Sequence, residues 1–133
     1  MGFKDIPLTM YGIMSDLLDW NYGPDERGEQ VRVLAINGND DWIVNTPGQM
    51  MVYDKLSWKG QAAYRVAPWQ HWSSNDARKS DKPSPFAGSG FWKQSSDRRV
   101  VLAGVDGAGH EVPKFQAKAS LDLVSRWLEG WNL

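Results

Sequence analysis

Two nearly uninterrupted apolar runs constrain the fold of this chain more than any other feature. They occupy residues 31–36 (VRVLAI) and 98–105 (RRVVLAGV), and both are rich in β-branched residues. Such runs are typical of strands buried on both faces, as in a parallel sheet covered by helices. The sequence therefore predicts an α/β layered fold in which these two strands are parallel.

Three segments carry the helical signals that such a fold needs. Residues 8–20 place apolar side chains on one face at helical spacing. Residues 47–57 follow a capping-box pattern, with Thr46 before a proline and Gln49 three positions later. Residues 115–129 end at Gly130, which is a favourable helix stop.

The stretch between the second helix and the second strong strand is harder to interpret. Residues 62–66 (AAYRV) are predicted as a short strand, and residues 68–90, rich in Pro, Ser, Asp, Lys and Gly, as a long surface excursion. Two strong strands are too few for an ordinary sheet, which has about four to six. The chain is therefore expected to be the end of a larger fold or one half of an assembly.

Composition excludes several classes of function. The chain has 133 residues, enough for one domain, and its net charge of −1 gives no basic excess for nucleic acid. No stretch approaches the ~20 apolar residues of a membrane helix. Cysteine is absent, which excludes disulfides, thiolate zinc sites and a cysteine nucleophile. No cofactor or metal is predicted, because Trp42 stands where a calcium loop starting at Asn37 would need glycine.

Polar residues that could perform chemistry follow each of the two strong strands. Asp40 and Asp41 follow the first strand, and His110 follows the second. Functional groups gather at the carboxyl ends of parallel strands, so an Asp and the His could meet there as the supporting half of a hydrolytic triad. The sequence contains no Gly-x-Ser-x-Gly nucleophile motif. We expect the serine of such a triad to precede residue 1 or to lie on another chain.

Four strings together resemble the C-terminal portion of the serine carboxypeptidase family. The resemblance is strongest to the fungal members of that family. They are VRVLAINGNDDWIVNTPG (31–48), LSWKG (56–60), RRVVLAGVDGAGHEVP (98–113) and ASLDLVSRWLEG (119–130). The resemblance implies the C-terminal portion of an α/β-hydrolase fold, with parallel strands flanked by helices. Residues 1–133 would form a single segment of that domain, completed by an N-terminal segment that is missing or supplied by a partner.

The resemblance also implies roles for individual residues. Asp41 matches the triad acid, because it directly precedes the aromatic–Ile pair, and His110 matches the general base. Glu111 matches a position that borders the pocket for the leaving residue. Asn45 matches a structural asparagine, and Val44 replaces a cysteine that is frequent in the family.

The function implied in this way is release of C-terminal amino acids from peptides, with Asp41 and His110 supplied by this chain. The implied partners are a peptide substrate and an N-terminal segment or large chain that carries the nucleophilic Ser. The implied location is secreted or vacuolar/lysosomal. Residues 1–7 lack the pattern of a signal peptide, so any signal is expected outside this chain. Alone, the chain is predicted to be inactive.

Two other functions remain compatible with the sequence. One is a non-catalytic binding or scaffold domain derived from the same fold, which the missing serine favours. The other is an acyltransferase or hydroxynitrile lyase on the same scaffold. Among other chemical candidates, His71 has no partner pattern. Three of the eight tryptophans flank the 68–90 excursion, and we consider them as walls of a substrate cleft: Trp69, Trp72 and Trp92.

Overall fold

The computed structural model describes residues 5–20, 30–74 and 88–130. In chain order its elements are α1 (Asp5–Asp19), β1 (Val33–Gly38), α2 (Thr46–Lys55), α3 (Gln61–Val66), β2 (Gln70–Ser73), β3 (Ser89–Gln94), β4 (Val100–Val105), α5 (Val112–Phe115) and α6 (Ala117–Leu128). Both strong strands and all three expected helices are present. The last helix is divided, because the backbone leaves helical geometry at Gln116 (φ −130°).

The sheet has four strands in the order β1-β4-β3-β2. The two strong strands β1 and β4 pair in parallel, with Gly38 opposite Val105 at their carboxyl ends. Strand β3 is antiparallel to β4, and β2 is antiparallel to β3. The prediction of parallel pairing is thus confirmed for the strong pair, but the sheet as a whole is mixed.

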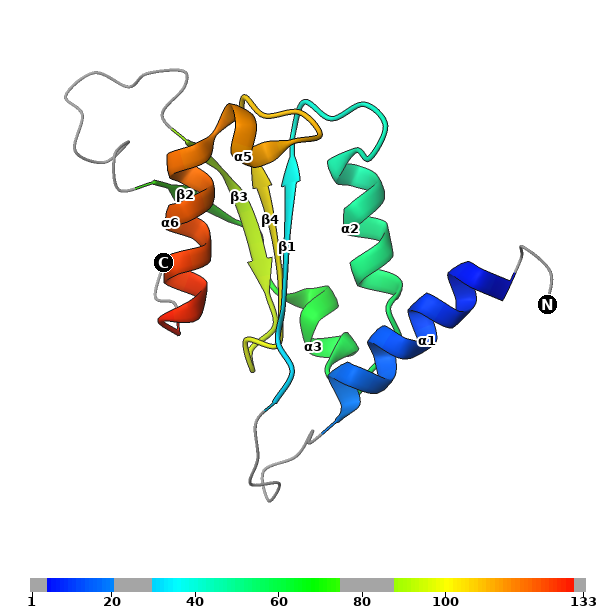
Figure 1. The fold of residues 1–133 in the computed structure, drawn as a ribbon. Helices are drawn as coiled ribbons and strands as arrows, with labels where there is room; N and C mark the ends of the chain where they lie inside the picture. Colours follow the sequence, from blue (N-terminus) through cyan, green and yellow to red (C-terminus); the bar gives the residue numbers. More distant parts are fainter. Residues whose placement is uncertain (1–4, 21–29, 75–87, 131–133) are drawn as a thin grey trace.

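Helices cover both faces of this sheet (Figure 1). Helices α5 and α6 lie on one face, and α1, α2 and α3 lie on the other. The side chains of strand β4 alternate between the two faces of the sheet and so contribute to the core on each face. Those that pack beneath α6 are Val101, Ala103 and Val105. Those in the core on the opposite face are Val100 and Leu102. All six residues of β4 are buried, as its unbroken apolar pattern requires.

Two predictions about the middle of the chain are wrong. Residues 62–66 belong to helix α3 rather than to a strand. The two alanines of this run favour helix, and Tyr64 is the buried anchor that turns one face inward. The proposed excursion at 68–90 contains β2 and the start of β3, whose backbones pair with each other. Its central part, residues 75–87, lies outside the described residues.

A buried arginine ties α1 to the sheet. Arg99 is 1% exposed, and its Nε donates a hydrogen bond to the Val31 carbonyl at 3.0 Å. A terminal guanidinium nitrogen donates to the carbonyls of Leu17 and Trp20 at 3.2 and 3.0 Å. The Leu17 and Trp20 carbonyls lie at the C-terminal end of α1. The last carbonyls of a helix lack helical partners, and the helix dipole favours a cation there. Within the described parts of the chain, no helix is long and apolar enough to cross a membrane.

Candidate active site

The two residues predicted to form a catalytic pair lie on adjacent loops. Asp41 follows β1 and His110 follows β4, and the parallel pairing of those strands brings both loops to the same edge of the sheet. His110 Nδ1 lies 2.7 Å from Asp41 Oδ2. The structure therefore brings together side chains that are 69 positions apart in the sequence. Because a carboxylate only accepts hydrogen bonds, neutral His110 must carry its proton on Nδ1.

The carboxylate of Asp41 is held rigidly. The residue is 7% exposed, and its second oxygen accepts hydrogen bonds from the backbone N–H groups of Ile43 and Val44, each at 3.0 Å. The pKa of Asp41 is lowered, chiefly by the Val44 N–H bond and then by His110, against the opposing effect of burial. Asp41 is therefore an ionised, pre-oriented acceptor for His110 at neutral pH.

The His110 side chain is much more exposed than that of Asp41. Its side chain is 69% exposed, so the imidazole edge opposite Asp41 is open. An imidazole held in the Nδ1–H form has an available Nε2 lone pair, which can take a proton from a hydroxyl. The pair thus has one buried and fixed member and one accessible member.

The two loops approach each other so closely that only glycine fits at the end of β1. A Cβ added to Gly38 would lie 2.3 Å from the carbonyl oxygens of both Ala108 and Gly109. Backbone hydrogen bonds use this proximity: Asn39 N–H donates to Val105 at 2.9 Å, and Asp40 N–H to Ala108 at 3.0 Å. The Gly at position 38 is therefore required by the contact between the Asp41 loop and the His110 loop.

A second polar cluster, not predicted from the sequence, lies beneath the pair. Asn39 donates to Asp106 at 2.6 Å and accepts from Thr46 at 2.8 Å. Thr46 also accepts from Asn37 at 2.9 Å, and Asp106 accepts from Ser89 at 3.2 Å. The signal that could have revealed this cluster is the position of Asn39 and Asp106 immediately after the two strong strands.

The remaining predicted residues near the site have distinct positions. Asp40 is exposed, consistent with a turn residue, and Asn45 caps α2 by accepting from the Gly48 N–H at 2.8 Å. Glu111 follows His110 and is exposed. Its carboxylate pairs with the Lys114 ammonium group at 2.9 Å. Val44 takes part through its backbone N–H.

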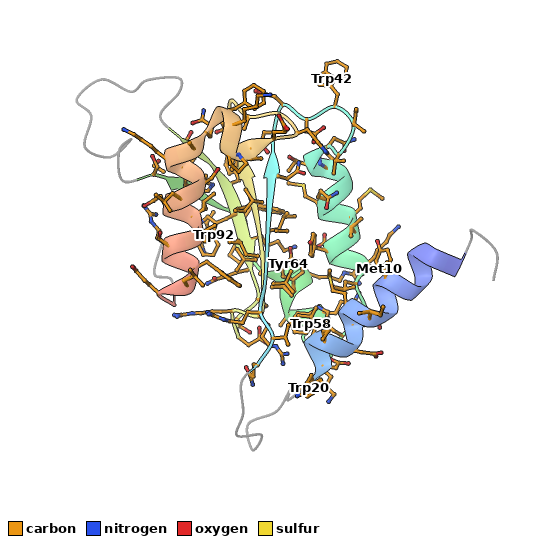
Figure 2. All side chains as sticks on the ribbon, in the orientation of Figure 1. Met10, Trp20, Trp42, Trp58, Tyr64 and Trp92 are labelled. Atoms are coloured by element: carbon orange, nitrogen blue, oxygen red, sulfur yellow. The ribbon has the colours of Figure 1, made fainter. Side chains whose placement is uncertain are left out.

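The other aromatic and histidine candidates lie elsewhere. His71, on β2, contacts the Phe91 ring edge-on at 5.6 Å. Trp72 and Trp92 are buried in the core beneath α6, so the prediction that they line a cleft is wrong; Figure 2 shows Trp92 between α6 and the sheet. Trp69 lines a hollow of about 250 Å³ beside α2. Trp42, directly after Asp41, is 93% exposed and projects beyond the strand ends (Figure 2).

Possible metal ligands do not gather in the described segments. Among those residues, no group of three or more His, Cys, Asp or Glu side chains is arranged to hold an ion. The spacing that resembles a calcium loop concerned Asn37, Asn39 and Asp41, and Trp42 at the glycine position argued against such a loop. The structure engages each of these three side chains in hydrogen bonds with other protein groups.

Comparison with known proteins agrees with the motifs. The family described as serine carboxypeptidase matches residues 21–130. Carboxypeptidase Y homolog A of Sclerotinia sclerotiorum is 31% identical over 105 residues, which cover 79% of this chain and 17% of that protein. The Pyricularia oryzae protein of the same name is 33% identical over 101 residues, or 76% of this chain and 17% of that protein. The chain thus spans less than a fifth of the length of these relatives.

Proposed function

Because this chain belongs to the serine carboxypeptidase family, we propose that it supplies the acid and base of a Ser–Asp–His triad that releases C-terminal amino acids from peptides. The observation that carries the proposal is the 2.7 Å hydrogen bond between His110 Nδ1 and Asp41 Oδ2. Asp41 is the buried acid and His110 the accessible base. Their arrangement matches the supporting half of a triad.

The chemistry assigned to the two residues follows from their positions. His110 Nε2 takes the proton of a serine hydroxyl while the serine oxygen bonds to the scissile carbonyl carbon. His110 then gives that proton to the leaving amine as the C–N bond breaks. Water then attacks the acyl-enzyme carbonyl and gives a proton to His110, which returns it to the serine oxygen as the ester bond breaks and the shortened peptide is released. Asp41 stays ionised throughout and stabilises the imidazolium form of His110.

The serine itself is proposed to come from a segment or chain outside the 133 residues. In this proposal, residues 1–133 are the C-terminal segment of an α/β-hydrolase domain. Strand β1 supports it, because it stands at one edge of the described sheet, and an edge strand presents backbone N–H and C=O groups with which a further strand can pair. Helix α1 also supports it, since an apolar row on its surface is exposed and continues into the residue after the helix: Met10, Ile13, Leu17 and then Trp20. Such a row is the kind of surface that a further part of a fold buries.

The leaving residue is proposed to pass beside Glu111. That carboxylate is exposed next to His110, and Lys114 partly neutralises it through the 2.9 Å ion pair. The proposed substrate is therefore a peptide whose C-terminal residue lies beside the Glu111 carboxylate and the Lys114 ammonium group. The compartment that goes with this proposal is secreted or vacuolar.

The proposal is tested on the assembled protein that contains this chain together with its serine-bearing part. We expect Asp41→Asn to lower kcat for an N-blocked dipeptide by about 10⁴-fold and His110→Ala by about 10⁶-fold. His71→Ala, which removes the other histidine, and Asp40→Asn, which removes the neighbouring exposed carboxylate, are matched controls and should leave kcat unchanged. Activity that survives both site substitutions would refute the assignment.

A second measurement separates the proposed reaction from its alternatives. The released products are identified with and without an added alcohol acceptor. A peptidase yields a free C-terminal amino acid and a free acid in water, whereas an acyltransferase yields the ester. The isolated 133-residue chain should release nothing. Cleavage by the chain alone, abolished by His110→Ala, would contradict the placement of the nucleophile outside it.

A further inference from the structure

The side chains of Asn39 and Asp106 connect the two loops that carry the proposed catalytic pair. Asn39 lies two positions before Asp41, and Asp106 lies four positions before His110. The Asn39 amide donates to Asp106 Oδ1 at 2.6 Å, a short distance typical of a bond to a charged acceptor. A direct side-chain contact therefore joins the Asp41 loop to the His110 loop beneath the pair.

The direction of every hydrogen bond in this cluster follows from the Asp106 carboxylate. A carboxylate only accepts, so Asn39 must present its NH₂ group to Asp106 and its oxygen to Thr46. Thr46 then donates to Asn39 and accepts from Asn37. Ser89 donates to the other oxygen of Asp106. Such a chain, with all donors pointing toward one charge, is cooperative and has one stable arrangement.

The cluster is also confined by packing. Asn37 and Thr46 are buried. The Asn39 side chain lies against Gly104 of β4, where an added Cβ would stand 2.5 Å from Asn39 Oδ1. The absence of a side chain at position 104 therefore leaves the space through which Asn39 reaches Asp106.

His110 has little else to fix its position. Its side chain is 69% exposed, and Asp41 is its one hydrogen-bond partner among the described residues. The 2.7 Å contact thus depends on the spacing of the two loops. We infer that Asn39 and Asp106 are positioning residues that hold those loops in register, so that Asp41 selects the Nδ1–H form of His110. The catalytic meaning of this inference rests on the proposed function; the geometric part does not.

The test is an exchange of the two side chains. Asn39→Asp sets two carboxylates against each other and removes the bond. The double variant Asn39→Asp/Asp106→Asn restores it in the reverse sense, because the new amide can donate to the new carboxylate while its oxygen accepts from Ser89. The double variant also keeps the net charge of the wild type. Asp40→Asn changes the charge of the same loop outside the cluster and is the matched control.

The measurement is the tautomer of His110, read from the ¹⁵N shifts of its ring nitrogens in the full chain at a pH where the ring is neutral. With only two histidines, His71 is the internal reference. In the wild type we expect Nδ1–H to dominate. Asn39→Asp should move the ratio of Nδ1–H to Nε2–H toward Nε2–H by at least about tenfold, because the charge-assisted bond is lost. The double variant should return it, and Asp40→Asn should leave it unchanged.

Two results would overturn the inference. One is a folded Asn39→Asp protein with the wild-type ratio, and the other is a double variant whose ratio stays at that of the single variant. Should Asn39→Asp fail to fold, Asn39→Ala removes the bond without adding charge and is expected to shift the ratio in the same direction; an unchanged ratio there would equally refute it. None of these readouts needs activity. Failure of the inference is thus distinct from failure of the proposed function, which the kcat values of Asp41→Asn and His110→Ala decide.

Discussion

Replacing Gly38 by alanine would separate the two halves of the site without removing any functional group. The added methyl would start 2.3 Å from the carbonyl oxygens of Ala108 and Gly109. Ordinary contacts of a Cβ atom begin at 3.4 Å, so the 106–110 loop must move by about 1 Å. Both obstacles are backbone atoms of the loop that carries His110. The whole loop, and not one flexible side chain, has to yield.

The cost follows from the bonds that this movement breaks. Carried along the loop to His110, a 1 Å shift lengthens the 2.7 Å contact with Asp41 to about 3.7 Å, beyond hydrogen-bond range. The same shift stretches the 3.0 Å bond from the Asp40 N–H to the Ala108 carbonyl. Stretching the neutral bond between Asp40 and Ala108 alone predicts a loss of about 1 kcal/mol in the free energy of unfolding. The His110 tautomer should lose its preference for Nδ1–H at the same time.

Urea unfolding gives the free energy, and ¹⁵N spectra give the tautomer. Gly12→Ala is the control, since a Cβ at position 12 of α1 meets nothing within 4 Å. It should be neutral or stabilise by up to about 1 kcal/mol, as alanine is the better helix former. A Gly38→Ala protein within about 0.5 kcal/mol of the wild type, with an unchanged tautomer, would refute the argument that these loops are in forced contact.

Two further predictions concern charge. The pKa of Asp41 is lowered by the Val44 N–H and by His110, so the folded state binds this proton more weakly than the unfolded state does. The resulting stabilisation is complete well above the ordinary pKa of 3.8 and is lost as pH falls through the lower folded value. Asp41→Asn should therefore unfold with a flatter pH dependence below about pH 4 in urea titrations; parallel curves for the two proteins would contradict this. Arg99→Ala should cost about 3–5 kcal/mol in urea, because three carbonyls lose a buried donor, whereas exposed Arg65→Ala should stay within about 0.5 kcal/mol. Equal effects of the two arginine substitutions would disprove the anchoring role of Arg99.

The parts of the fold that the sequence predicts well are those with a strong and local signal. Strand β4 is apolar throughout, as expected for a strand that is buried on both faces. The apolar run at 98–105 predicted it over nearly the same residues. The proline at position 47 likewise predicts the start of α2 to within one residue, but the predicted N-cap is wrong: Asn45, and not Thr46, caps the helix by accepting from the Gly48 N–H. Asp41 and His110 were expected to meet because each follows a strong strand, and the structure brings them within 2.7 Å.

What the sequence could not predict depends on contacts between distant segments. Short apolar runs such as 62–66 suit helix and strand alike, and burial of Tyr64 decides between them. Strands β2 and β3 are stabilised by pairing with each other and with β4, which no local pattern reveals. Asn39 and Asp106 read as ordinary turn residues, and their partnership appears only when β1 and β4 lie side by side.

The sheet order has a consequence for how proteins of this design can vary over evolution. Strand β1 pairs directly with β4, while β3 and β2 lie on the other side of β4. In the interval between the two site residues, helix α3 and strands β2 and β3 therefore lengthen the path along the chain without standing between Asp41 and His110 in space. Insertions and deletions in that interval alter the far edge of the sheet and leave the distance between the two side chains intact. The interval is a region where such a chain can acquire new surface while keeping the contact between Asp41 and His110.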